Sequence, residues 1–143
     1  MQFPVRIPFV DLLGFRLQRM DAGEAEITFD AQPEHLNSFD VVHGGASMTL
    51  LDVTMAHAAR SVEPSMGAVT IEMKTSFMRP GKGALRATGR LLHRTATMAF
   101  TEGSVFDAGG KLCIHATATF KFLRALPISG REARPAAKPR SNV

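Results

Sequence analysis

The chain has one cysteine and no long apolar run. The first excludes a protein held by internal disulfides, and the second excludes a membrane-spanning helix. Among its 143 residues Cys113 is the one cysteine, so no disulfide can form within the chain. No apolar stretch reaches the ~18 residues that span a bilayer. The N-terminus lacks the charged head and apolar block of a signal peptide. We therefore expect a cytoplasmic protein that has no membrane partner.

Tryptophan and tyrosine, on which nucleic-acid bases often stack, are both absent. Of the net charge of +4, residues 125–143 carry +3, from four basic residues against Glu132, and residues 1–124 carry the remaining +1. No groove-reading motif is present. We therefore expect no nucleic-acid partner. We expect one nearly neutral domain over residues 1–124, followed by a basic, Pro- and Ala-rich tail over 125–143 that is disordered.

One stretch, residues 42–60, organises the rest of the chain. Its part from Ala46 to Ala59 contains no Gly or Pro and is rich in Met, Leu and Ala, which are strong helix formers. The pattern predicts one helix of ~17 residues and roughly 25 Å. Apolar residues run almost all the way round it, so we expect it to be buried. It contains one carboxylate, Asp52, which is costly to bury in ionised form without a partner.

The start of this helix follows His43 and begins with Gly44 and Gly45. Two glycines let another group approach the free N–H groups of the first turn, which favour a negative charge or a developing oxyanion. Asp52 comes nine residues after His43, so the two point to opposite sides and lie ~13 Å apart along the axis. If both serve one substrate, one must come from a second copy. The spacing therefore predicts a homodimer with shared sites.

Alternating apolar and polar residues predict two strands before the helix and four after it. The expected strands span residues 14–20, 24–29, 68–78, 84–93, 96–106 and 112–122. We expect an arm or short helix over residues 3–13 and one helical turn after Pro33. One long apolar helix packed on a curved antiparallel sheet is the economical arrangement, an α+β fold.

The strand expected over 68–78 has one apolar and one polar face. Its alternation puts Val69 and Ile71 on the apolar face, together with Met73, Thr75 and Phe77. Thr70 then lies on the opposite, polar face. A Pro- and Gly-rich turn follows over residues 79–83.

This pattern resembles the hotdog fold and, within it, the PaaI-type acyl-CoA thioesterases of phenylacetic acid degradation. The resemblance covers roughly residues 8–123. It depends on Asn37, Val42-His43-Gly44-Gly45, Leu51-Asp52, residues 69–73 and Phe77-Met78-Arg79-Pro80. It implies hydrolysis of acyl-CoA thioesters without metal or cofactor. It also implies homodimers, often paired into homotetramers, with the active site at the dimer interface. The many Met, Ala and Phe residues suit aromatic or short- to medium-chain acyl groups, and the sequence does not decide between them.

The resemblance also implies a role for each matching residue. Asn37 and the backbone N–H of Gly44 would polarise the thioester carbonyl, because donors must meet the charge that develops on oxygen. Asp52 of the other subunit would activate water as general base, or attack as nucleophile. Thr70 would orient the water, and His43 would fix the loop.

Four further residues are expected to bind substrate. Gly45 belongs to the same helix start as Gly44. Arg79 and Lys82, on the turn after residue 77, are expected partners of the CoA phosphates. Thr95 is expected to lie along the adenosine and phosphate end of CoA, at the start of a strand.

Structural roles remain open for the same residues. Asp52 could pair with a buried arginine or cap a loop, His43 could be a plain helix cap, and Asn37 and Thr70 could be ordinary turn and strand residues. Cys113 has no local base and is expected to be a core residue. The histidines lack acidic or cysteine partners at ligand spacing, so we expect no metal site.

Two other functions on this fold remain open. An enoyl-thioester hydratase needs an acid/base pair, usually His with Asp or Glu, facing one substrate carbon. A non-catalytic acyl-CoA-binding regulatory module usually carries an attached DNA-binding domain, for which we see no sequence. A binding module also has no need of a desolvated carboxylate such as Asp52.

Overall fold

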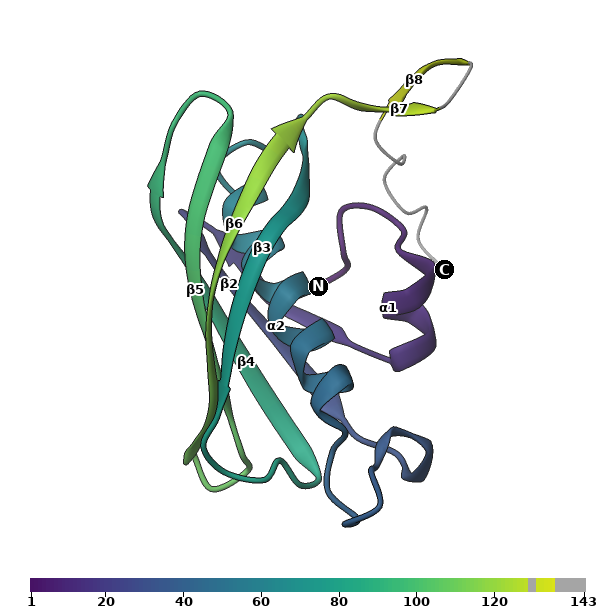
Figure 1. The fold of residues 1–143 in the computed structure, drawn as a ribbon, viewed down its shortest axis with the longest axis vertical. Coiled ribbons are helices and arrows are strands. Elements are labelled where there is room, and N and C mark those ends of the chain that lie inside the picture. Colours follow the sequence, from purple (N-terminus) through teal and green to yellow (C-terminus); the bar gives the residue numbers. More distant parts are fainter. Residues whose placement is uncertain (129–130, 136–143) are drawn as a thin grey trace.

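A long helix lies against one face of a curved antiparallel sheet (Figure 1). The computed structural model describes residues 1–128 and 131–135. The elements in order are α1 (Pro8–Leu13), β1 (Arg16–Asp21), β2 (Glu24–Asp30), the 3-10 turn η1 (Pro33–His35), α2 (Gly44–Arg60), β3 (Gly67–Phe77), β4 (Ala84–Arg94), β5 (Met98–Phe106), β6 (Leu112–Leu123), β7 (Ala125–Ile128) and β8 (Arg131–Pro135).

The main sheet has six strands in the order β1-β2-β4-β5-β6-β3, and every neighbouring pair is antiparallel. The expected α+β hotdog arrangement, with two strands, the helix and four strands, is confirmed. The strand boundaries differ from the expected ones by at most two residues. Strands β1 and β3 form the two edges of the sheet, so β3 has one side free for a further strand.

Two glycines let α2 approach the sheet closely. Gly89 in β4 and Gly103 in β5 lie directly opposite each other. A Cβ on Gly89 would lie 3.0 Å from the carbonyl oxygen of Thr54, and a Cβ on Gly103 would lie 3.0 Å from Cγ of Met55. Because such distances are tighter than nearly all Cβ contacts in proteins, the absence of a side chain at both positions lets α2 lie this close to the sheet.

Helix α2 is buried on its sheet side but not all round. Leu50, Leu51 and Met55 are completely buried, as the apolar pattern predicts. Met48 is 38% exposed, and Thr49, Asp52, Val53 and Ala56 are only partly buried. The expectation of a fully buried helix therefore holds on one side, and an uncovered stripe runs along the other.

The expected alternation of β3 is wrong at its start, because the strand contains a bulge. In the pairing with β6, Thr70 lies opposite Phe120 and Glu72 lies opposite Thr119, so Ile71 is an extra residue. The extra residue turns Thr70 toward the helix side of the sheet. Ile71, expected on the apolar face, is 55% exposed.

The ends of the chain add short elements. Helix α1 starts at Pro8, a favoured first position, and ends at Leu13; the following residue, Gly14, caps it with a φ of 75°, which suits glycine. The expected short helix and the turn after Pro33 are confirmed. In the tail, which was expected to be disordered over residues 125–143, β7 and β8 pair with each other. The rest of that expectation falls on residues 129–130 and 136–143, which lie outside the described residues.

Within residues 1–128 and 131–135, no helix is long and apolar enough to cross a membrane.

Candidate active site

Asp52 lies near the middle of α2 and is partly buried. Its Oδ1 accepts a hydrogen bond of 2.6 Å from the hydroxyl of Thr70 in β3. Burial raises the pKa of Asp52, and the Thr70 hydrogen bond opposes that rise. Among the described residues no basic side chain pairs with Asp52 and no backbone N–H donates to its carboxylate, so neither an ion pair nor a loop cap accounts for it. A carboxylate with a raised pKa and one free oxygen can accept a proton.

The start of α2 offers one backbone donor rather than two. His43 is the N-cap, and its Nδ1 accepts a hydrogen bond of 2.8 Å from the N–H of Gly45. The Nδ1 of His43 is therefore a hydrogen-bond acceptor. Such a bond suits the expected role of His43 in holding the loop before α2. The N–H of Gly44 has no acceptor within the described part of the chain. At the positive end of the helix dipole, it is available to a developing oxyanion.

Asn37 shapes the loop before α2 and keeps a donor free. Its Oδ1 accepts hydrogen bonds from the N–H of Phe39 at 2.9 Å and from that of Val41 at 3.4 Å. Its backbone N–H also donates to the carbonyl of Val41. Asn37 is thus a turn residue, one of the two roles left open. Its side-chain NH2 has no partner among the described residues, so it can donate to a ligand.

Asn37 and Gly44 line the same pocket, which has a volume of about 410 Å³. Ser47, Phe77, Met78 and Arg79 also line this pocket, which we call the Asn37 pocket. The ring of Phe77 covers Gly44 so closely that a Cβ there would lie 3.3 Å from it. Two residues with a hydrogen-bond donor that is unpaired in the described chain thus line the same pocket as apolar residues, a typical binding-site composition.

The structure does not bring Asp52 to this pocket within one chain. Asp52 comes eight residues after Gly44 in α2, a distance of about 12 Å along the axis. Asp52 instead belongs to the uncovered stripe of α2, next to the free edge of β3. One chain thus holds the donors and the carboxylate apart.

The expected phosphate partners lie at the outer end of the Asn37 pocket. Arg79 lines it directly, and Lys82 is an exposed residue next to Gly81, another lining residue. The carbonyl of Gly81 accepts a hydrogen bond of 2.9 Å from the N–H of Val42. This bond ties the basic turn to the loop that starts α2.

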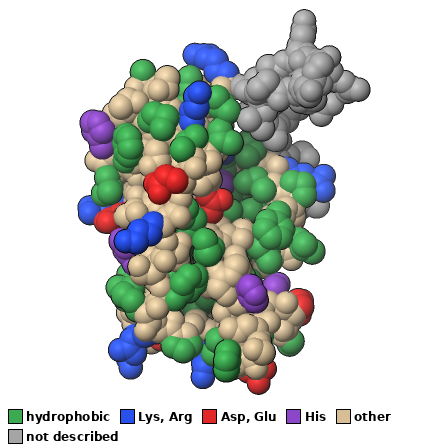
Figure 2. All heavy atoms as spheres, viewed as in Figure 1, with side chains coloured by type: hydrophobic (Ala, Val, Ile, Leu, Met, Phe, Trp, Pro, Cys, Tyr) green, Lys and Arg blue, Asp and Glu red, His purple; other side chains and the backbone are tan. Residues whose placement is uncertain are grey.

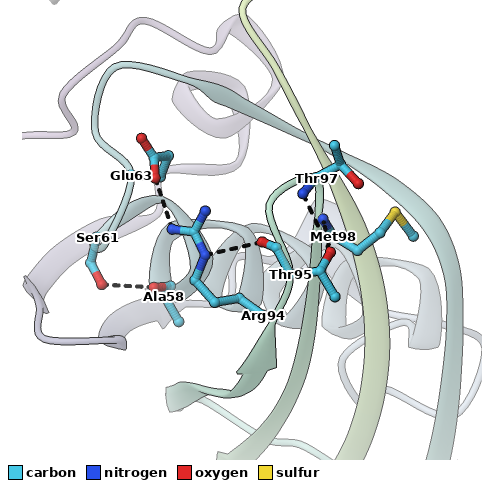
Figure 3. Close-up of polar contacts among 7 residues, drawn as sticks. All are labelled: Ala58, Ser61, Glu63, Arg94, Thr95, Thr97 and Met98. Carbon is cyan, nitrogen blue, oxygen red and sulfur yellow. Dashed lines mark hydrogen bonds and ion pairs between the residues drawn. The ribbon is translucent and has the colours of Figure 1, made fainter.

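Thr95 lies at the opposite end of α2 and has a structural task there (Figure 3). Its hydroxyl accepts hydrogen bonds from the N–H groups of Thr97 and Met98, which form the turn between β4 and β5. The expected strand start at residue 96 is therefore part of a turn. Next to it, Arg94 forms an ion pair of 2.8 Å with Glu63, just beyond α2. A substrate contact from Thr95 requires a second copy of the chain.

Ser47 is a pocket residue to which the sequence pattern assigned no role, whereas Phe77 belongs to the Phe77-Met78-Arg79-Pro80 motif of the resemblance. Ser47 follows Gly44 by three residues, and helical spacing puts such pairs on one face. That spacing was a usable signal. For Phe77, which ends β3, the motif of the resemblance was a signal, but its position over Gly44 depends on how the strand crosses the helix.

Comparison with known proteins identifies the class. The sequence profile of the Thioesterase superfamily matches residues 39–114, more than half of the chain, and this range includes the start of α2, Asp52 and Thr70, while Asn37 lies just before it. The chain belongs to the Thioesterase superfamily. The expected class of activity, thioester hydrolysis, is confirmed at the level of the family.

Several individual proteins of known name or structure are similar to this chain. A protein of Saccharolobus solfataricus, named as a candidate esterase, is 31% identical over 113 residues, 78% of this chain and 81% of that protein. Human acyl-coenzyme A thioesterase 13 is 29% identical over 93 residues, 63% of this chain and 66% of that protein. A phenylacetic acid degradation-related protein from Ralstonia eutropha, described as a candidate thioesterase, has a similar structure. Its TM-score is 0.75 at 30% identity, over 81% of this chain and 91% of that one. The resemblance to PaaI-type proteins is confirmed.

Proposed function

We propose that this protein hydrolyses acyl-CoA thioesters to the free acid and CoA. The observation that carries the proposal is Asp52, a partly desolvated carboxylate without a basic partner in the described chain, held by the Thr70 hydroxyl. Structural acids are normally paired, whereas a general base benefits from a raised pKa. Human acyl-coenzyme A thioesterase 13 supports the choice of substrate class.

The reaction uses the donors and the base as follows. The side-chain NH2 of Asn37 and the N–H of Gly44 donate to the carbonyl oxygen and stabilise the oxyanion that develops there. Asp52 of a second subunit takes a proton from water while the water oxygen bonds to the carbonyl carbon. The carbon–sulfur bond then breaks, and the proton passes to the CoA sulfur. Acid and thiol leave, and Asp52 is again a carboxylate.

The shared site requires a homodimer, and two features support one. The free edge of β3 can pair with the same strand of a second copy, and the uncovered stripe of α2 lies beside that edge. Such a dimer would cover Met48 and Val53 and bring Asp52 of one copy toward the helix start of the other. Pairing of dimers into a tetramer remains part of the proposal.

The basic turn supports an orientation for CoA. Arg79 lies on the lining of the Asn37 pocket, and exposed Lys82 is three residues further on. Both can bind phosphate groups at the surface. The pantetheine arm would then run through the Asn37 pocket to Gly44. Thr95 of the second subunit is a further candidate contact.

The test is thiol release from phenylacetyl-, benzoyl-, short-, medium- and long-chain acyl-CoAs by wild type and by Asp52→Asn. Asparagine keeps the size of the side chain and removes the base. We expect kcat to fall by about 10²- to 10⁴-fold while the protein stays folded and dimeric. Asp11→Asn, a change of an exposed acid in α1, is the matched control and should keep full activity.

Two results would contradict the proposal. Wild-type protein that binds acyl-CoA without turning over any thioester would favour the regulatory module. Wild-type protein that adds water to an enoyl-CoA without releasing thiol would favour the hydratase. Full activity in Asp52→Asn would leave thioester hydrolysis intact and remove Asp52 as its base.

A further inference from the structure

A second pocket lies on the other side of the start of α2. It has a volume of about 210 Å³ and lies between α1, the loop around η1 and the first two turns of α2. Its apolar lining comes from Phe9, Leu13, Leu36 and Ala46, so we call it the Phe9 pocket. Figure 2 shows hydrophobic side chains over α1 beside histidine side chains at the start of α2.

The two pockets meet the same short segment from opposite sides. Gly44 lines the Asn37 pocket, while its neighbours His43 and Gly45 line the Phe9 pocket. Gly44 has the free N–H at which the thioester carbonyl is expected. Two arms leave that carbonyl, one through sulfur to pantetheine and one to the acyl group. Because the two pockets lie on either side of the Gly44 N–H, one can bind the pantetheine arm and the other the acyl group.

The charged residues of the two pockets indicate that the phosphate-bearing CoA arm enters the Asn37 pocket and the acyl group enters the Phe9 pocket. Arg79 lines the Asn37 pocket, and a phosphate-bearing arm is attracted to a basic group. The charged side chain that lines the Phe9 pocket, apart from the histidines, is Glu34, which repels phosphate. Phe9 is 53% exposed, although it is a large apolar side chain. Apolar groups left exposed around a concave site are typical of ligand contact.

We propose that the Phe9 pocket is the acyl subsite and that Phe9 and Leu13 determine which acyl groups are hydrolysed. The inference rests on the proposed function, since it concerns the same reaction. A cavity of about 150 Å³ accommodates benzene in another protein. A pocket of about 210 Å³ therefore has room for one aromatic ring or a short aliphatic chain.

Several polar atoms of the Phe9 pocket make hydrogen bonds within the chain, as suits a pocket for an uncharged acyl group. The Nδ1 of His35 accepts a hydrogen bond of 2.9 Å from the N–H of Gln32, and the Nδ1 of His43 accepts one from the N–H of Gly45. The hydroxyl of Thr49 donates to the carbonyl of Gly45 at 2.8 Å. These three polar atoms are thus already engaged within the chain, and the apolar side chains provide the contact surface for the acyl group.

The experiment measures kcat/KM for acetyl-, hexanoyl-, phenylacetyl- and decanoyl-CoA with wild type, Phe9→Ala and Leu13→Ala. We expect kcat/KM for phenylacetyl- and hexanoyl-CoA to fall by about tenfold or more, while acetyl-CoA, which lacks the apolar arm, changes less than twofold. Inhibition by free CoA should stay unchanged, because CoA has no acyl arm. Leu12→Ala is the matched control, since Leu12 is 77% exposed on the same helix and does not line the pocket.

A second variant fills the pocket instead of emptying it. Ala46→Leu should shift the preference toward acetyl-CoA while free CoA still inhibits. An unchanged acyl profile in all three pocket variants would overturn the inference. A second result would also overturn the inference: the oligomer dissociates in Phe9→Ala while the acyl-group preference of Ala46→Leu is unchanged. In that case α1 would be part of a contact between subunits. Absence of wild-type hydrolysis of every thioester would instead contradict the proposed function.

Discussion

The hydroxyl of Thr70 donates to Oδ1 of Asp52 over 2.6 Å, and a β-bulge makes this contact possible. In a regular strand, Thr70 would share a face with Glu72 and point away from α2. The extra residue Ile71 reverses the side of Thr70 and of the residues before it. Bulges next to functional sites often redirect one side chain in this way. Here the bulge gives the carboxylate its hydrogen-bond donor.

Removing this donor should shift the pH dependence of hydrolysis. The hydrogen bond from Thr70 lowers the pKa of Asp52 against the larger, opposite effect of burial. In Thr70→Val the pKa rises further, so the protonated, inactive form persists to higher pH. We expect the acid limb of the kcat profile to move to higher pH, with kcat/KM about tenfold lower at neutral pH, as loss of one charge-assisted hydrogen bond implies. Thr70→Ser should restore both, and an unchanged acid limb in Thr70→Val would contradict the role of Asp52 as base.

Two inactive variants should complement each other if the site is shared between subunits. Asn37→Asp keeps the oxygen that accepts from Phe39 and Val41 but loses the donor NH2. Asp52→Asn loses the base. A hybrid dimer of the two variants has one doubly altered site and one unaltered site. Random mixing should therefore restore about a quarter of wild-type activity. Mixtures that stay as inactive as the separate variants would contradict the shared site.

Much of the fold could be predicted from the sequence because its signals are local. The Met- and Leu-rich run with Gly44 at its start defines α2, and alternation defines the strands. The helical spacing between His43 and Asp52 also predicts that the two diverge, which the structure bears out. Such statements need only the geometry of one element.

The features that could not be predicted depend on how helices and strands pack against one another. The bulge at Ile71 becomes visible only in the pairing with β6, and it alone decides the side of Thr70. The turn formed by Thr95 looks like strand sequence, because β-branched residues favour strands in general. The Phe9 pocket needs α1 against α2, two segments about thirty-five residues apart in the chain. No local pattern encodes that contact.

Alanine at two glycines should separate packing from catalysis. A Cβ on Gly89 would lie 3.0 Å from the Thr54 carbonyl oxygen, which is fixed backbone, so α2 must move away from the sheet. We expect Gly89→Ala to lower the free energy of unfolding by about 1–3 kcal/mol, as overpacking does. A Cβ on Gly44 meets only the Phe77 ring, which is 53% exposed and can turn outward. Gly44→Ala should therefore stay stable in thermal denaturation yet lose activity. Equal melting temperatures for the two variants would contradict this packing.

His57 should make the protein less stable in mild acid. It is 2% exposed, its ring packs edge-on against Phe3 at 5.1 Å, and its Nδ1 donates to the carbonyl of Val53. Its Nε2 has no partner among the described residues. Burial, with a smaller contribution from Arg60, lowers the pKa of His57 to about 4 from 6.5.

The sign of the effect follows from proton binding. Between pH 6.5 and 4 the unfolded chain binds a proton at His57 that the folded chain does not, so folding stability falls as the pH falls through this window. The stabilisation by the neutral ring is complete above pH 6.5 and lost below pH 4. From pH 7 to pH 5 the loss from this one group is about 2 kcal/mol. Chemical denaturation at both pH values should show a difference of this size between wild type and His57→Gln, which has no titrating group there. His93→Gln, at an exposed position, is the control and should follow wild type, and a parallel pH dependence of wild type and His57→Gln would contradict the buried neutral histidine.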